Sequence, residues 1–138
     1  MVILKPLLFT DLPFLLEVRN HDSTRINLEN DSIFNLEQCE KWFTNLKPSW
    51  YTINVDNTPV GYFRTEENCI GADIHIDYRR KGYAYQAYKE YLKDKTYANL
   101  WVFEDNFAKQ LYLKLGFKET SEVKIIRDRL YIKMECEK

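Results

Sequence analysis

Apolar and polar positions alternate between Ala72 and Asp77, which is typical of a strand with one buried face. From Ala84 to about Asp94 the apolar residues instead recur every three or four positions, and this spacing predicts an amphipathic helix. The basic stretch Arg79–Ala84 connects the two segments. A strand, a glycine-containing turn and a helix are therefore predicted to follow one another in the middle of the chain.

The same patterns predict the elements on either side of this centre. Before it we expect a strand at Val2–Leu4, a helix from Thr10 or Asp11 to Asn20, an irregular segment His21–Ile33, a helix from Leu36 to Leu46 capped by Asn35 with Gln38, and strands at Trp50–Val55 and Val60–Arg64. After it we expect a strand at Leu100–Phe103, a helix from Asp105 or Asn106 that Gly116 ends, and a strand at Leu130–Met134, with a further strand around Val123–Arg127 left open. The order is β-α-α-β-β-β-α-β-α-β, and the short connections between strands favour antiparallel pairing.

Composition limits the classes of protein to which the chain can belong. Its 138 residues suit one domain, so we expect residues 1–138 to form a single domain with its own core. Hydrophobic residues make up 45% and charged residues 30%, as in soluble globular proteins. The formal net charge of −1 argues against nucleic acid as a partner. No signal-peptide segment or run of about 18 apolar residues is present, which argues against a membrane partner.

The cysteines indicate the cellular compartment. Cys39, Cys69 and Cys136 are widely separated and form no C-x-x-C pair. This spacing argues against both a disulfide framework and a zinc ribbon. A reducing, cytoplasmic location is therefore expected.

The turn after the central strand is a candidate anion-binding site. The N–H groups in the first turn of a helix have no intrahelical partner, and the helix dipole places partial positive charge there. Gly82 can adopt backbone angles that other residues avoid, and Ala84 leaves room for a pyrophosphate. Arg79, Arg80 and Lys81 add mobile positive charge. The turn therefore indicates a nucleotide-bearing cofactor, although an ordinary connection with solvated basic residues is the alternative.

Two motifs, together with the order of elements, resemble the GNAT superfamily of acyl-CoA-dependent N-acyltransferases over nearly the whole chain. The family motif that holds the pyrophosphate of coenzyme A is matched by Arg79, Arg80, Lys81, Gly82, Tyr83 and Ala84. A second family motif is matched by Asn106, Ala108, Leu111, Tyr112, Lys114, Gly116 and Phe117. The resemblance implies an α/β (α+β) fold with a single GNAT-like domain, whose central sheet is mixed and mostly antiparallel and carries helices on both faces.

The resemblance also implies roles around the cofactor. The strand before the turn diverges from its neighbour in this family, so backbone groups of Ala72 and Ile74 would bind the pantetheine arm, with an N–H near Ile74 at the developing oxyanion. Tyr112 matches the tyrosine that protonates the departing thiolate, and a core tyrosine is the alternative. The spacing from Asn106 to Tyr112 is one residue shorter than usual, so Asp105 is the alternative contact to the pantetheine.

The general base is left open among Glu66, Glu67, Asp73 and His75. Asp73 and His75 are predicted to share a strand face, and a histidine titrates near neutral pH. Trp101 stands where some relatives carry a catalytic glutamate. Asp73, His75 and Asp77 could also be read as a metal site, but no fourth ligand is evident, so we expect no metal.

Arg19 and Arg25 are the candidate acceptor-binding residues, because either could pair with a phosphate or carboxylate; Arg19 could instead stabilise its own helix end. The resemblance implies transfer of an acetyl group from acetyl-CoA to a primary amine of a small molecule, an amino sugar being one example. A protein N-terminal acetyltransferase, a non-catalytic acyl-CoA-binding domain and a nucleic-acid module are the alternatives. The sequence leaves monomer and homodimer equally open.

Overall fold

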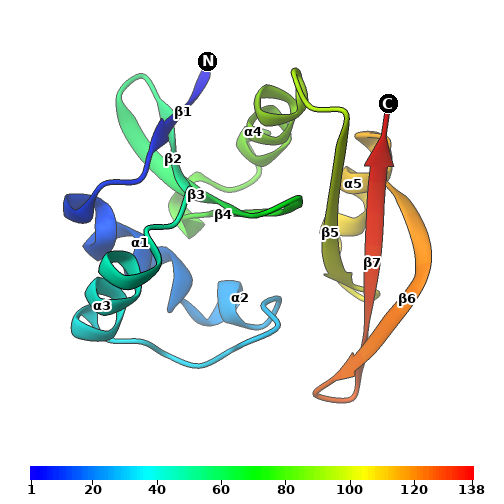
Figure 1. Cartoon of the computed structure of the whole chain (residues 1–138), viewed down its shortest axis with the longest axis horizontal. Coiled ribbons are helices and arrows are strands. Elements are labelled where there is room, and N and C mark those ends of the chain that lie inside the picture. The colour runs from blue at the N-terminus through cyan, green and yellow to red at the C-terminus, as the bar shows by residue number, and fades with distance from the viewer.

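One seven-stranded sheet, in the order β1-β2-β3-β4-β5-β7-β6, runs through the computed structural model, which describes all 138 residues (Figure 1). Its strands are β1 (Val2–Pro6), β2 (Tyr51–Val55), β3 (Thr58–Glu66), β4 (Cys69–Ile74), β5 (Tyr97–Phe103), β6 (Lys118–Ile126) and β7 (Arg129–Glu137). Only the β4–β5 pair is parallel, and every other neighbouring pair is antiparallel. The predicted mixed, mostly antiparallel sheet is confirmed.

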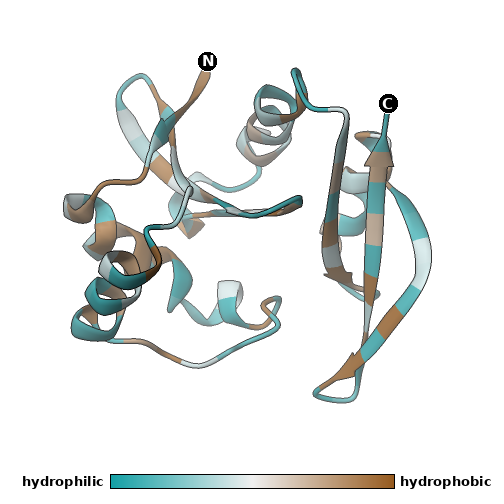
Figure 2. Cartoon of the chain, in the orientation of Figure 1, coloured by the Kyte–Doolittle hydropathy of each residue, from teal (hydrophilic) through white to brown (hydrophobic).

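Helices cover both faces of this sheet, as predicted. They are α1 (Leu12–Arg19), α2 (Asp22–Arg25), α3 (Leu36–Leu46), α4 (Tyr83–Leu92) and α5 (Ala108–Lys114), with short 3-10 turns at Phe9–Asp11 and Ile76–Tyr78. Side chains of consecutive strand residues point to opposite faces, so Tyr62 packs in a cluster with α1 and α3, whereas Phe63 packs in a larger cluster with α4. The alternation along β7 is visible in Figure 2. None of the helices combines the length and apolar character needed to cross a membrane.

Local sequence signals set several element boundaries correctly. The Asn35 side chain accepts a hydrogen bond from the Gln38 N–H at 2.8 Å, and the Gln38 side chain accepts one from the Asn35 N–H at 2.9 Å. This reciprocal pair is the predicted capping box of α3. Gly116, with a φ of 99°, follows α5 at the predicted stop.

Several predicted boundaries are wrong. The segment His21–Ile33 contains the short helix α2, and β5 begins at Tyr97 rather than Leu100. The strand left open around Val123–Arg127 is present as β6, which begins at Lys118. The central strand ends at Ile74 rather than Asp77. The His75 N–H makes the last ladder bond, to the Val60 carbonyl at 2.8 Å, and the chain then turns into the 3-10 segment. Alternation in the sequence therefore continues beyond the strand itself.

The two halves of the sheet separate between β4 and β5. These strands pair at a single position, Cys69 opposite Asn99, and diverge beyond it (Figure 1). Ala72 and Ile74 lie on the edge of β4 that faces the gap. The parallel pair thus opens the sheet next to the turn that the sequence identifies as an anion site.

Candidate active site

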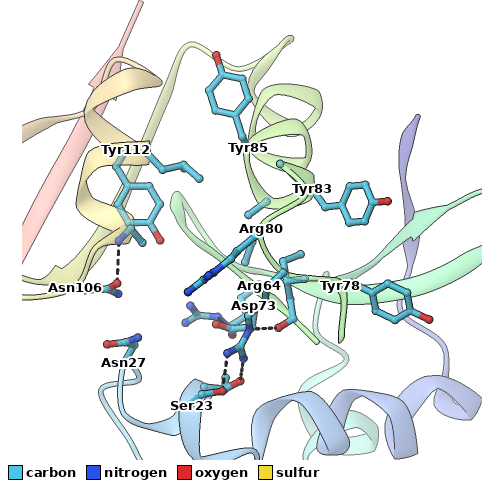
Figure 3. Close-up of a pocket in the computed structure, with 18 of the residues that line it drawn as sticks. Ser23, Asn27, Arg64, Asp73, Tyr78, Arg80, Tyr83, Tyr85, Asn106 and Tyr112 are labelled. Atoms are coloured by element: carbon cyan, nitrogen blue, oxygen red, sulfur yellow. Dashed lines mark hydrogen bonds and ion pairs between the residues drawn. The ribbon is translucent and has the colours of Figure 1, made fainter. Parts of the chain in front are cut away.

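A cavity of about 360 Å³ lies where β4 and β5 diverge. Its walls come from α2 and the turn after it, from β3, β4 and β5, from the turn before α4, and from α5 (Figure 3). It therefore joins the candidate anion site to the segment His21–Ile33, through Ser23, Thr24 and Asn27. Of the residues around it, Asp73 is the only one with a carboxylate.

Backbone N–H groups converge on one end of the cavity. Arg80 and Gly82 have positive φ angles, 64° and 79°, in the turn that leads into α4. The first intrahelical bond runs from the Gln86 N–H to the Gly82 carbonyl, and no side chain caps the helix. The N–H groups of residues 82–85 therefore have no intrahelical partner. Such a concave turn at a helix N-terminus has the geometry of an anion-binding site.

The three basic residues of the turn have different positions. Arg79 donates to the Ile74 carbonyl at 2.9 Å, to the Ser23 hydroxyl at 2.6 Å and to the Thr24 hydroxyl at 2.9 Å. Its guanidinium connects β4 to α2 and is not the mobile charge that we predicted. Arg80 extends into the cavity (Figure 3), whereas Lys81 is exposed and lies outside it.

Tyr112 lies on the opposite wall, in a chain of hydrogen bonds. The Tyr88 hydroxyl accepts from the Ala72 N–H at 2.9 Å and donates to the Tyr112 hydroxyl at 3.3 Å. The Ala72 N–H is thus used within the protein. The prediction that it is free to bind a pantetheine arm is therefore wrong. Burial raises the pKa of Tyr112, and the hydrogen bond from Tyr88 offsets part of that rise. Tyr112 therefore keeps its own proton at neutral pH and can direct it into the cavity.

The N–H of Ile74 points into the same gap. Backbone N–H directions alternate along a strand, and the His75 N–H is bonded to β3 while the Ala72 N–H faces Tyr88. The Ile74 N–H accordingly faces away from β3, toward the cavity. Its own carbonyl accepts the Arg79 bond. Backbone groups of Ala72 and Ile74 were both expected to be free on β4, and of their two N–H donors only that of Ile74 is.

Asp73 and Arg64 form an ion pair in the cavity wall, with 3.1 Å between the arginine Nε and one carboxylate oxygen. Arg64 comes from β3 and Asp73 from β4. Burial would lower the pKa of Arg64, but the neighbouring Asp73 raises it more, so the guanidinium stays charged. The structure thus places Asp73 in the cavity together with an arginine that sequence reasoning had missed.

The other candidate bases lie elsewhere. His75 stacks on Phe14, its Nδ1 accepts from the Asp77 N–H at 3.1 Å, and its Nε2 lies 3.3 Å from Glu17. With Nδ1 occupied as an acceptor, the ring proton is on Nε2, and no lone pair is free to act as a base. His75 does not line the cavity, whereas Asp73, which was predicted to share its strand face, does.

Glu67 lies near the end at which β4 and β5 are paired, and not at the end where they diverge. It occupies the exposed turn between β3 and β4, with a φ of 56°. Five residues of extended chain, about 16 Å, separate it from Ala72. Glu66 adjoins it in the sequence and, like Glu67, does not line the cavity.

Their hydrogen-bond partners distinguish Asp105 from Asn106, the two candidates for contact with the pantetheine arm. Arg129 holds the carboxylate of Asp105 through both oxygens, at 2.7–3.2 Å, away from the cavity. Asn106 lines the cavity, and its side chain accepts from the Ala108 N–H at 2.9 Å (Figure 3). Its amide nitrogen is left free to donate. The geometry therefore favours Asn106 over Asp105.

The predicted acceptor arginines are bound to backbone carbonyls. Arg19 donates to residues 30 and 32 at 2.7 and 2.8 Å, and Arg25 donates to residues 20 and 31 at 3.1 and 3.2 Å. Neither lines the cavity, so this geometry gives no support to a role in acceptor binding. The segment His21–Ile33 does reach the site, through Ser23, Thr24 and Asn27.

No protein-family model matches the sequence, and no curated protein is significantly similar to it in sequence. Solved structures are similar in fold. The spermidine N-acetyltransferase from Vibrio cholerae, in complex with CoA and spermine, is 16% identical with a TM-score of 0.89, covering 99% of this chain and 95% of that one. The ribosomal-protein-alanine N-acetyltransferase from Brucella melitensis is 17% identical with a TM-score of 0.76, covering 99% of each chain. An acetyltransferase from Thermus thermophilus is 17% identical with a TM-score of 0.78, covering 100% and 97%. The GNAT-like fold predicted from the two motifs is therefore confirmed.

Proposed function

We propose that the protein transfers an acetyl group from acetyl-CoA to a primary amine of a small molecule. One observation carries this proposal: a single cavity is bounded by the unpartnered N–H groups at the start of α4, the open Ile74 N–H and the Tyr112 hydroxyl. Acyl transfer from a thioester needs an anchor for the donor, a hydrogen bond to the oxyanion and an acid for the leaving thiolate. The solved structure from Vibrio cholerae, which shares the fold, contains CoA and spermine.

The residues present suit coenzyme A. The N–H groups of residues 82–85 and the Arg80 guanidinium would hold the pyrophosphate, and open space surrounds Gly82, where an added Cβ would meet nothing closer than 3.9 Å. The Ile74 N–H and the Asn106 amide would hold the pantetheine arm. When bound, acetyl-CoA supplies an activated acyl group, so the protein has only to position, polarise and transfer protons.

The proposed step assigns one task to each group. The amine nitrogen forms a bond to the thioester carbonyl carbon as the carbon–sulfur bond breaks, giving an amide and free CoA. The Ile74 N–H stabilises negative charge on the carbonyl oxygen. Tyr112 donates its proton to the departing sulfur, and Asp73 takes the proton that the amine loses.

Release of free thiol in the presence of acetyl-CoA and a panel of amines tests the proposal. We expect Tyr112→Phe to lower kcat at least 100-fold while the Kd for acetyl-CoA, measured by calorimetry, changes less than threefold. This pattern separates a proton donor from a binding residue. Tight acetyl-CoA binding without turnover of any amine would instead indicate a non-catalytic binding domain.

A further inference from the structure

We propose that the acceptor is a small zwitterion, an α-amino acid or close analogue, whose carboxylate binds Arg64 and whose ammonium group binds Asp73. The inference rests on the proposed acetyltransferase function and names the substrate class of that site. Its evidence is the charge pattern in the half of the cavity that lies away from the turn before α4.

The charged residues divide the cavity into two halves. Arg64, Asp73, Arg79 and Arg80 are the charged residues in its wall. The Arg79 guanidinium already donates hydrogen bonds to Ile74, Ser23 and Thr24, and Arg80 belongs to the anion-binding turn. The acceptor half therefore contains one guanidinium and one carboxylate. A polyamine or an amino sugar with several ammonium groups would find a single acid, already facing an arginine, and would be poorly matched in charge.

Arg64 presents an unused set of donors. Its Nε faces Asp73, while its two terminal nitrogens make no hydrogen bond or ion pair with the rest of the protein. The guanidinium lies across β4, and a Cβ at Gly71 would approach its terminal nitrogen to 2.2 Å. Because Gly71 has no side chain, the planar group can lie against the strand beside Asp73. Terminal N–H groups of this kind suit a carboxylate bound through both oxygens.

The position of Asp73 fixes where the amine would lie. Asp73 immediately precedes Ile74, whose N–H faces the proposed oxyanion position. The Asp73 oxygen that lies 3.1 Å from the Arg64 Nε is buried and accepts no hydrogen bond within the protein. An ammonium group donating to this carboxylate would lie beside the thioester. Since Arg64 and Asp73 touch, the ammonium and carboxylate of the acceptor should be separated by one or two carbon atoms.

The remaining walls suit the substituent of such an acceptor. Trp101, from β5, supplies an aromatic wall; its ring stacks on Tyr131 at 5.4 Å and has the Lys124 ammonium 4.5 Å from its centroid. Ser23 and Asn27 supply polar groups from the α2 side (Figure 3). The site therefore has a fixed polar contact for the zwitterion and a separate surface for its side chain.

Matched acceptors give a direct test in the wild-type protein. Each of the twenty common amino acids would be compared with its amide and, where one exists, its decarboxylated amine, at fixed acetyl-CoA. We expect at least one amino acid to show a kcat/KM at least 100-fold higher than that of its amide. Comparable or faster turnover of the amides, of spermine or of an aminoglycoside would overturn the assignment while leaving the acetyltransferase function intact.

Two variants test the role of Arg64. We expect Arg64→Met to reduce the ratio of kcat/KM for the amino acid to kcat/KM for its amide to below fivefold, with the Kd for acetyl-CoA unchanged. We expect Gly71→Ala to reduce the same ratio by displacing the Arg64 guanidinium. Equal losses for acid and amide would indicate a merely structural role and refute the proposal. If Arg64→Met does not fold, the wild-type ratio still decides. Failure of every amine, with no acetyl-CoA binding, would instead refute the proposed function.

Discussion

Replacing Tyr88 with phenylalanine removes one oxygen from the centre of the site. That hydroxyl accepts from the Ala72 N–H at 2.9 Å and donates to Tyr112 at 3.3 Å, and Tyr88 is 1% exposed. The ring would keep its packing on Phe63, with centroids 5.3 Å apart. The substitution therefore tests the two hydrogen bonds with little change in the core.

The structure sets the expected magnitude. In the variant the Ala72 N–H faces a ring edge instead of an acceptor, and a buried donor left unsatisfied costs about 1–3 kcal/mol. We expect the free energy of unfolding to fall by about 1.5 kcal/mol, and Tm by roughly 3–6 °C for a chain of this size. Tyr112 also loses the donor that lowers its pKa. A weaker acid should reduce kcat by about tenfold, a typical part of a general-acid contribution.

Urea unfolding followed by circular dichroism measures the stability, and thiol release measures the rate. Tyr91→Phe is the matched control, because Tyr91 lies on the same helix and packs on the same Phe63, but its hydroxyl makes no hydrogen bond. That variant should unfold within about 0.5 kcal/mol of wild type. Equal stabilities for the Tyr88 and Tyr91 variants would show that the hydrogen-bonded chain contributes nothing, and the reasoning would fail.

Three further substitutions or conditions extend the test. Arg79→Met should destabilise the fold by about 2–4 kcal/mol in urea unfolding, because it removes the three hydrogen bonds that the guanidinium donates to β4 and α2, whereas Lys81→Met should leave stability unchanged. Gly82→Ala places a side chain at a φ of 79° at a cost of about 1–2 kcal/mol, and calorimetry should show weaker acetyl-CoA binding; unchanged affinity would contradict the role of the turn. Burial raises the pKa of Tyr131 to about 12, so its neutral form stabilises the fold fully below pH 10, and about 2–3 kcal/mol is lost as pH rises from 10 to 12. Urea midpoints that fall no faster in wild type than in Tyr131→Phe across this range would refute that assignment.

The donor side of the site was predictable because it depends on local sequence. An anion turn needs a strand, a glycine able to adopt positive φ and a following helix, and all three lie within a short stretch ending at α4. Tyr112 was found by its motif, and the structure places it on the wall of the same cavity. The strand divergence that joins them came from the resemblance alone, since no local pattern encodes a single-residue parallel pairing.

The acceptor side was not predictable, because it depends on which side chains meet across strands. Arg64 reaches Asp73 only through the register that places Gly71 opposite Arg64, and a pairing register cannot be read from either strand alone. His75 and Arg19 were attractive because free side chains of those types bind substrates well. Both are instead occupied, His75 by Asp77 and Glu17, and Arg19 by two loop carbonyls. A titratable residue type identifies a candidate, but the partners that use its donors and lone pairs decide whether any chemistry is left to it.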